Sequence, residues 1–302
     1  MSLKAGSARA SHSNTARFSA LGAACLFSTG GAAIKGTALT AFQVASFRSG
    51  VAALALVLLL PESRRGFRLD LLPAAFSYAG TLACFVIANK LTTGAAAIFL
   101  QSTAPIWVIL LAPWLIGESM RTRDLPYLAA AALGLLLVFL GSGGPAATAP
   151  HPALGNVVAL GSGFFYALLL IFFRRLAKHD TQDRTLPATV MGNALACLLC
   201  APFAFPVETV TTHDALSILY LGVVQIGLAY WLFTRALRKL PALEVALLIL
   251  LEPVLNPLWT WLTLDERPSN LALAGGGVMI AALAAKALFD RAPEPLAVPL
   301  TD

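Results

Sequence analysis

The sequence predicts an all-α membrane protein with ten transmembrane helices, arranged as two inverted repeats of five helices each. Three observations support this prediction: a strongly apolar composition, apolar runs that match the thickness of a bilayer, and basic residues that alternate between loops. Of the 302 residues, 58% are hydrophobic and 12% are charged, which is about half the charged fraction of an ordinary soluble domain. Lipid must therefore surround most of this chain.

The apolar runs are continuous, and their length matches about 30 Å of hydrocarbon at about 1.5 Å per helical residue. In hydrocarbon every backbone polar group needs a partner within the protein, so only helices and closed barrels can span a bilayer. A barrel would alternate apolar and polar residues over strands of about ten residues, and these runs do not alternate. The ten predicted spans are 18–34, 41–60, 71–89, 93–116, 125–141, 155–173, 187–206, 215–234, 241–264 and 270–290.

The basic residues divide unevenly between the two sides that these spans define. The N-terminal stretch, the loops after the second, fourth, sixth and eighth spans, and the C-terminal end together hold 17 of the 21 Lys and Arg residues. The opposite loops hold Lys35, Lys90 and Arg267; Lys286, near the end of the tenth span, is counted with the C-terminal end, and Arg48 alone lies well inside a span. Because Lys and Arg gather in cytoplasmic loops, we expect a multi-pass protein of the cytoplasmic (inner) membrane with both termini in the cytoplasm.

A repeated spacing relates the fourth and ninth spans. Pro105 precedes Glu118 by 13 residues, and Pro253 precedes Glu266 by the same number, at an offset of 148 residues. Since each copy would hold five spans, an odd number, the second copy must lie inverted, as in many secondary transporters. The predicted organisation is a cytoplasmic N-terminal tail (1–17), a first repeat (18–141), an external linker (142–154), a second repeat (155–290) and a cytoplasmic C-terminal tail (291–302).

The second half carries a run of residues typical of one transporter group. The run is Gly222-Val-Val-Gln-Ile-Gly-Leu-Ala-Tyr-Trp-Leu-Phe, followed by Leu251-Glu-Pro-Val-Leu-Asn-Pro-Leu-Trp and then by Glu266. This order resembles the drug/metabolite transporter (DMT) superfamily, in particular its EamA-type exporters, and it is most similar to members that export amino acids, aromatic ones included. The stretch from Ala95 to Glu118 looks like the matching copy in the first half. The Asp265-Glu266 pair departs from the Gly-Glu usual in the family.

The resemblance implies two EamA-like halves of five helices each, a central cavity lined by the first four helices of each half, and efflux from the cytoplasm. Two prolines are expected to interrupt helices near this cavity, because proline lacks the backbone N–H that a helix needs. These helix-breaking residues are Pro105 and Pro253.

Two charged residues within the spans are candidates for gating or coupling. An unpaired Arg48 facing lipid would cost about 2.5 kcal/mol or more, so it either attracts a carboxylate, forms a gate ion pair, or serves as an interfacial structural residue. Glu252 stands directly before Pro253. A buried carboxyl group could take up a proton during a transport cycle, which makes a proton the candidate coupling ion; the alternative is a fixed hydrogen-bond acceptor. Glu266 and Glu118 are interpreted as solvated residues at span ends.

Six further residues within the spans are candidates for substrate binding. Polar side chains at this depth usually face protein or a water-filled cavity, and aromatic rings could stack on an apolar part of a substrate while amides bind its polar head. The alternative for each is ordinary packing. The candidates are Tyr78, Gln101, Gln225, Tyr230, Trp231 and Asn256.

No residue pattern indicates an enzyme, a cofactor, a metal or a nucleic-acid interface. The sequence has no G-x-x-x-x-G-K-[ST] motif for nucleotide phosphates, and its four histidines lie in tails or loops. The net charge of +6 is spread over short loops, whereas a nucleic-acid-binding protein gathers its basic residues on one face. These observations disfavour an intramembrane enzyme.

We therefore expect a secondary transporter that exports small metabolites across the membrane by alternating access, with amino acids, including aromatic and hydrophobic ones, as the leading substrates. Its partners would be this small-molecule substrate and the lipid bilayer, with a substrate or proton gradient as energy source. The alternative is a sugar-phosphate, nucleobase or drug carrier of the same superfamily. A sugar phosphate would need more than one cation deep within the membrane, and Arg48 is the only basic residue that the sequence places there. A channel ranks lower.

Overall fold

The computed structural model describes residues 2–117, 122–141, 143–179, 184–237, 239, 240, 245 and 248–289. In these residues every regular element is a helix, and one isolated bridge joins Ala146 to Ala149. Two apolar helices, Leu125–Leu140 and Asn270–Lys286, are shorter than a typical span. Seven stretches are long and apolar enough to cross a membrane: Thr15–Lys35, Ala41–Leu59, Leu69–Leu91, Gly94–Ile116, Pro152–Leu176, Thr185–Ala204 and Thr212–Ala236. The predicted all-helical membrane fold is thereby confirmed for the described residues.

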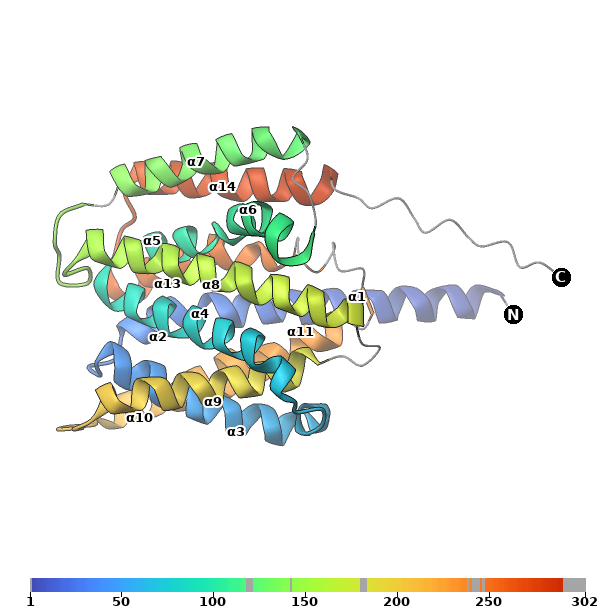
Figure 1. The fold of residues 1–302 in the computed structure, drawn as a ribbon, viewed down its shortest axis with the longest axis horizontal. Coiled ribbons are helices and arrows are strands. Elements are labelled where there is room, and N and C mark those ends of the chain that lie inside the picture. Colours follow the sequence, from blue (N-terminus) through green and yellow to red (C-terminus); the bar gives the residue numbers. More distant parts are fainter. Residues whose placement is uncertain are drawn as a thin grey trace.

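The first half of the chain contains the helices α1 to α7 (Figure 1). Their bounds are α1 (Ser2–Ser28), α2 (Gly30–Lys35), α3 (Ala41–Leu59), α4 (Leu72–Leu91), α5 (Gly94–Gln101), α6 (Ala104–Ile116) and α7 (Leu125–Leu140), with short 3-10 turns at Pro61–Arg64, Leu69–Leu71 and Thr122–Asp124. Local chemistry sets several of these ends. Thr40 begins α3 with a capping box that also uses Gln43, and Gly117 ends α6 in the left-handed conformation at φ 70°.

The second half contains the helices from α8 onward. Their bounds are α8 (Pro152–His179), α9 (Thr185–Ala204), α10 (Thr212–Leu219), the π-helix η4 (Tyr220–Leu228), α11 (Ala229–Leu237), α13 (Leu251–Leu264) and α14 (Asn270–Phe289). Thr211 starts α10 with a capping box that uses Asp214. The predicted ninth span begins in residues that are largely outside the described part of the chain, and Pro253 lies in the first turn of α13.

The first, fourth and eighth predicted spans are not continuous α-helices in the described residues. The first divides at Thr29, directly before Gly30 and Gly31, and the fourth divides at Ser102 and Thr103, shortly before Pro105. Glycine gives little helix support and proline cannot donate a backbone hydrogen bond, so both interruptions have a local cause. The eighth span passes from α10 through the π-helix η4 into α11. Such π segments are rare and are found mostly near functional sites.

Helices from the two halves pack directly against one another. The helix α4 contacts α8 and α9, α3 contacts α9 and η4, α1 contacts α11 and α13, and α7 lies along α14 (Figure 1). The α7–α14 contact depends on glycine. A Cβ atom added at Gly134 would lie 2.7 Å from the carbonyl oxygen of Gly275, which is closer than non-bonded atoms can approach.

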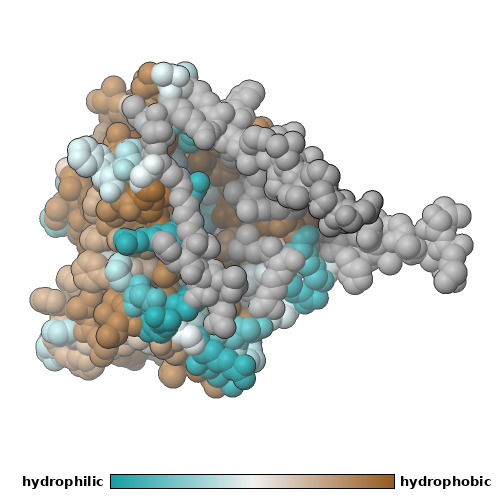
Figure 2. All heavy atoms as spheres, turned by 45° about the vertical axis from the view of Figure 1, so that its right-hand side comes forward, coloured by the Kyte–Doolittle hydropathy of each residue, from teal (hydrophilic) through white to brown (hydrophobic). Residues whose placement is uncertain are grey.

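The bundle has two distinct ends and an apolar flank. The start of α1 and the last turns of α14 lie at one end, while α2 and the start of α10 lie at the other (Figure 1). Figure 2 shows apolar side chains over much of the flank, with hydrophilic residues gathered in patches. Large apolar residues such as Leu58, Leu198 and Phe203 are at least 66% exposed. These features define a multi-pass protein whose flank faces lipid.

Candidate functional site

A cavity of about 160 Å³ lies within the bundle, between helices of both halves. Its walls come from α1, α3, α4, α5 and α8, and from η4, α11 and α13. Six of the residues singled out in the sequence line it together: Arg48, Tyr78, Gln101, Gln225, Tyr230 and Glu252. The fold thus brings six polar or aromatic residues from distant parts of the chain to one enclosed space.

Arg48 supplies a buried positive charge to this cavity. It lies on α3, which packs against α9 and η4, and only 2% of the residue is exposed. Its Nε and Nη1 atoms have no hydrogen-bond partner among the described residues. A buried donor without a partner is costly, and a buried charge more so. An anion in the cavity would relieve both costs.

Glu252 supplies a carboxyl group to the same cavity from the first turn of α13. Within the described part of the chain, no ion pair joins it to Arg48. The cavity therefore presents an acid and a base that do not neutralise each other by direct contact. This arrangement is suited to a ligand that carries both a negative and a positive group.

Two amide side chains add polar groups that are partly held in place. The Gln101 Nε2 atom donates to the Ser162 hydroxyl at 2.8 Å, and this hydroxyl donates to the Thr81 carbonyl oxygen at 2.9 Å. Gln225 Nε2 donates to the Phe27 carbonyl oxygen at 3.2 Å, while its Oε1 atom is buried without a partner among the described residues. Gln225 can therefore accept one further hydrogen bond.

Aromatic rings form much of the remaining wall. The Tyr230 ring lies edge-on to Phe27 and to Phe233, with centroid distances of 5.3 and 6.3 Å, and tilted to Tyr78 at 6.2 Å. Such edge-to-face pairs are favourable beyond their burial. Tyr166 of α8 also lines the cavity. The cavity can therefore surround an apolar or aromatic group.

The two other predicted substrate-binding residues do not line this cavity. Asn256 is fully buried, and an added Cβ atom at Gly31 would lie 2.7 Å from its Oδ1 atom, so its amide packs against α2. Trp231 is 36% exposed, and the Arg235 guanidinium lies over its ring at 5.4 Å. Neither residue is among those that line the central cavity.

A buried ion pair that the sequence pattern did not predict lies outside the central cavity. Lys35 Nζ and Glu266 Oε2 are 3.0 Å apart, and their side chains are 3% and 5% exposed. Glu266 Oε1 also accepts from the Gly94 backbone N–H at 2.6 Å. The interpretation of Glu266 as a solvated end residue is therefore wrong. Its partner is 231 residues away in the sequence, and no local pattern links them. Glu118 lies outside the described residues.

The described residues contain no group of three or more His, Cys, Asp or Glu side chains that could hold a metal ion. All four cysteines, Cys25, Cys84, Cys197 and Cys200, are free thiols.

An all-helical membrane protein with a polar cavity enclosed between its halves has the architecture of a small-molecule transporter. The EamA-like transporter family matches this chain over residues 14–140 and 153–285. The protein therefore belongs to the EamA-like transporter family, within the drug/metabolite transporter superfamily. As a member of this family it is a membrane transporter that handles a small molecule in a lipid environment.

Named relatives include exporters. A protein of Escherichia coli (strain K12) named "Probable amino-acid metabolite efflux pump" is 26% identical over 201 residues, which cover 63% of this chain and 66% of the relative, just under two thirds. The pseudopaline exporter CntI of Pseudomonas aeruginosa (strain UCBPP-PA14) is 28% identical over 251 residues, covering 81% of this chain and 85% of the relative. A solved crystal structure matches 90% of this chain and 98% of its own with a TM-score of 0.60 at 22% identity, which supports the fold alone.

Proposed function

We propose that the protein exports small metabolites that carry both a carboxylate and an ammonium group, in particular amino acids with aromatic or hydrophobic side chains. The observation that carries this proposal is a cavity that holds both Arg48 and Glu252: among the described residues, Arg48 Nε and Nη1 have no hydrogen-bond partner and no ion pair joins the two side chains. The carboxylate would bind Arg48 through charge-assisted hydrogen bonds, and the ammonium group would face Glu252. The aromatic wall around Tyr230 would hold the side chain. The E. coli relative named for amino-acid metabolite efflux is consistent with this substrate class.

We further propose that the chain forms ten spans in two inverted halves, 18–141 and 155–290, joined by an external linker at 142–154. The helix contacts support a two-fold relation between the halves. If the spans correspond in order, α3 matches α9 and α7 matches α14, and both pairs are in contact. The contact of α4 with α8 likewise matches that of α11 with α1. The terminal tails at 1–17 and 291–302 would lie in the cytoplasm. This orientation is favoured because their side of the membrane would hold 17 basic residues and the opposite side three.

Transport would follow alternating access, in which exchanging the conformations of the two halves opens the cavity to one side and then to the other. The interruptions at Thr29 and Ser102 lie beside the cavity and provide places where helices can bend. Glu252 would take up and release a proton in this cycle and so couple export to a proton gradient.

Transport of radiolabelled phenylalanine into proteoliposomes tests the substrate proposal. Arg48→Lys keeps the charge but changes the donor geometry, and loss of one charge-assisted hydrogen bond, about 1.5–3 kcal/mol, should lower transport roughly 10- to 100-fold below saturation. Arg267→Lys is the control, because Arg267 lies outside the cavity and its side chain is 74% exposed. Phenylalanine transport by Arg48→Lys at the wild-type rate would contradict the proposal. Inhibition by a sugar phosphate but not by amino acids would favour the alternative substrate class.

Coupling is tested separately by measuring transport with and without a pH gradient. Glu252→Gln removes the proton-binding carboxyl group but keeps its size. The variant is expected to transport at a rate that no longer depends on the gradient. An unchanged response of this variant to the gradient would remove Glu252 from the coupling role.

A further inference from the structure

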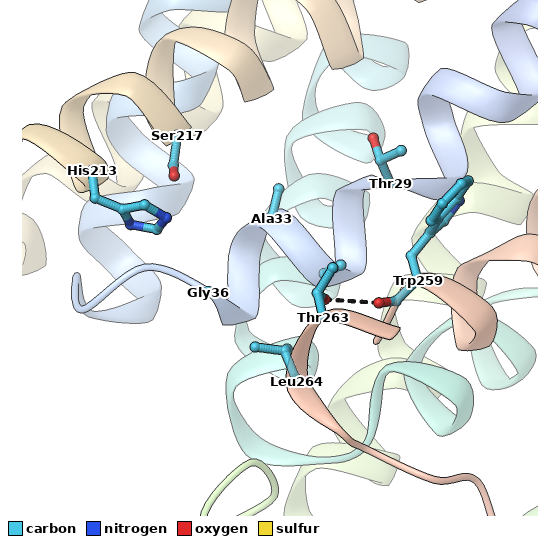
Figure 3. A pocket seen from close by; sticks show the side chains of 9 residues that line it. Thr29, Ala33, Gly36, His213, Ser217, Trp259, Thr263 and Leu264 are labelled. Atoms are coloured by element: carbon cyan, nitrogen blue, oxygen red, sulfur yellow. Dashed lines mark hydrogen bonds between the residues drawn. The ribbon is translucent and has the colours of Figure 1, made fainter. Parts of the chain in front are cut away.

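A second cavity, of about 430 Å³, lies between α2, α10 and α13. Figure 3 shows His213 and Ser217 on α10 at one side of α2, with Trp259 and Thr263 of α13 at the other side. The cavity is near the end of the bundle that is opposite the start of α1 (Figure 1). Its lining holds hydroxyl groups, one imidazole and one indole, and no Lys, Arg, Asp or Glu side chain.

The junction of α1 and α2 borders both this outer cavity and the central one. Phe27 lines the central cavity, and Thr29, two residues further on, lines the outer one. On the facing helices, Gln225 lines the central cavity and Trp259 the outer one. The stretch 27–29 is therefore in contact with the walls of both cavities.

Three hydrogen bonds from other helices converge on this junction. Gln225 Nε2 donates to the Phe27 carbonyl oxygen at 3.2 Å, and the Trp259 indole N–H donates to the Ser28 hydroxyl at 2.8 Å. The Thr29 and Tyr220 hydroxyl groups share a third hydrogen bond of 2.8 Å. Each consecutive residue of the junction is therefore tied to η4 or to α13.

A glycine pair directly follows the junction. Gly30 and Gly31 are both buried, and the end of the Gln225 side chain packs on Gly30, so that an added Cβ atom there would lie 2.8 Å from Gln225 Nε2. Hinges consist of a few residues at the ends of helices, and these residues are often small. A change in the angle between α1 and α2 at the glycine pair, with the end of α1 moving away from η4 and α13, would separate all three hydrogen bonds together.

We propose that the outer cavity is a release site for the transported amino acid and that residues 27–29, tied to Gln225, Trp259 and Tyr220, form the gate between the two cavities. This inference rests on the proposed function of the central cavity. The physical basis for release is the difference in charge: the central site offers Arg48 and Glu252, whereas the outer site offers only hydroxyl, imidazole and indole groups. A zwitterion therefore binds more weakly in the outer cavity and leaves it.

Cysteine labelling tests the gate without knowledge of the substrate. In a full-length background with the four native cysteines replaced by alanine, Ser217→Cys reports on the outer cavity and Thr81→Cys on the central one. A membrane-impermeant methanethiosulfonate is applied to each side of oriented vesicles. Ser217→Cys should react from the side opposite the termini, with or without the gate hydrogen bonds. Reaction of Ser217→Cys only with a membrane-permeant maleimide would mean that the cavity opens to lipid, which would overturn the proposal.

The gate itself is tested by Trp259→Phe combined with Tyr220→Phe, which leaves an aromatic ring at each position and removes two of the three hydrogen bonds. Labelling of Thr81→Cys from the outer side should become about tenfold faster, because each lost bond had favoured the closed gate. Thr263→Val is the matched control, since its hydroxyl donates to the Trp259 carbonyl oxygen within α13 and does not cross the gate (Figure 3). Unchanged labelling of Thr81→Cys in the double variant, with Ser217→Cys still reactive, would overturn the gate.

Protection by phenylalanine separates the release site from the proposed function. Phenylalanine should slow modification of Thr81→Cys at low concentration and of Ser217→Cys only at a concentration at least about tenfold higher, as expected when an ionic contact is lost. Protection of Thr81→Cys alone would overturn the release site and leave the proposed function standing. Protection of neither cysteine would reject phenylalanine as the substrate and the release site with it, while the labelling rates would still decide whether residues 27–29 form a gate.

Discussion

Replacing Glu266 by glutamine is expected to destabilise the protein strongly, although the new side chain has nearly the same shape. Lys35 and Glu266 form an ion pair of 3.0 Å that is almost completely buried. Glutamine can still accept the hydrogen bond that the Gly94 backbone N–H donates to Glu266, so the substitution removes the negative charge and little else. The Lys35 ammonium group is then left buried without a counter-charge.

The size of the effect follows from what remains around Lys35. Removing one partner of a buried ion pair costs about 3–5 kcal/mol. Lys35 Nζ also donates to the carbonyl oxygens of Asn89 and Thr92, at 2.8 and 2.7 Å, and to that of Thr148. These dipoles continue to stabilise the cation, which places the loss near the lower end, about 3 kcal/mol. At roughly 2 °C per kcal/mol for a chain of this length, the unfolding temperature should fall by about 6 °C.

Thermal unfolding of the purified protein in detergent measures this fall, and the neighbouring ion pair is the control. Asp265 and Arg267 are 3.5 Å apart with side chains 84% and 74% exposed, so Asp265→Asn should change stability by less than about 1 kcal/mol. Combining Glu266→Gln with Lys35→Met removes both charges and should recover part of the loss. A fall of less than about 2 °C for Glu266→Gln would refute the reasoning, as would a double variant whose loss is the sum of the two single losses.

Gly134→Ala and Gly30→Ala are expected to have different effects, the first on stability and the second on transport. Gly134→Ala would place a Cβ atom 2.7 Å from the Gly275 carbonyl oxygen; because backbone cannot move aside cheaply, overpacking should cost about 1–3 kcal/mol in thermal unfolding. Gly277→Ala, with nothing within 4 Å of the new atom, is the control and should be neutral or stabilising. Gly30→Ala would meet the end of the Gln225 side chain, which can move, so stability should change by less than about 1 kcal/mol while transport slows. Transport by Gly30→Ala at the wild-type rate would contradict this expectation.

Much of the fold could be predicted because the strongest signal, hydrophobic runs of bilayer length, is local in the sequence. The interruptions at Thr29 and Ser102 also carry local signals, namely the glycine pair that follows the first and Pro105 after the second. The π-helix Tyr220–Leu228 carries none. Its hydrogen-bonding pattern is accommodated by contacts with α3 and α10, and these contacts depend on tertiary packing that the sequence does not display.

The central cavity could also be predicted in part, because some of its residues stand out locally in the sequence. Polar and charged residues in apolar runs are costly, so their presence marks positions that face protein or water, and Arg48, Glu252 and Gln225 all line the cavity. Depth in the membrane does not specify the face of a helix, however. Asn256 packs against Gly31 of α2 and Trp231 lies under the Arg235 guanidinium, and neither lines the central cavity.

The contrast between two deeply buried cations, Lys35 and Arg48, supports different roles for them. Lys35 is held by a carboxylate and three carbonyl oxygens, so its charge is compensated by the fold alone and a ligand would add little. Arg48 is equally buried, but its Nε and Nη1 atoms have no partner among the described residues, and it faces a cavity. A fold gains nothing from a charge that it leaves uncompensated. A carboxylate bound beside Arg48 would gain binding energy by compensating this charge, which is why the proposal of an anionic substrate group depends on Arg48 and not on Lys35.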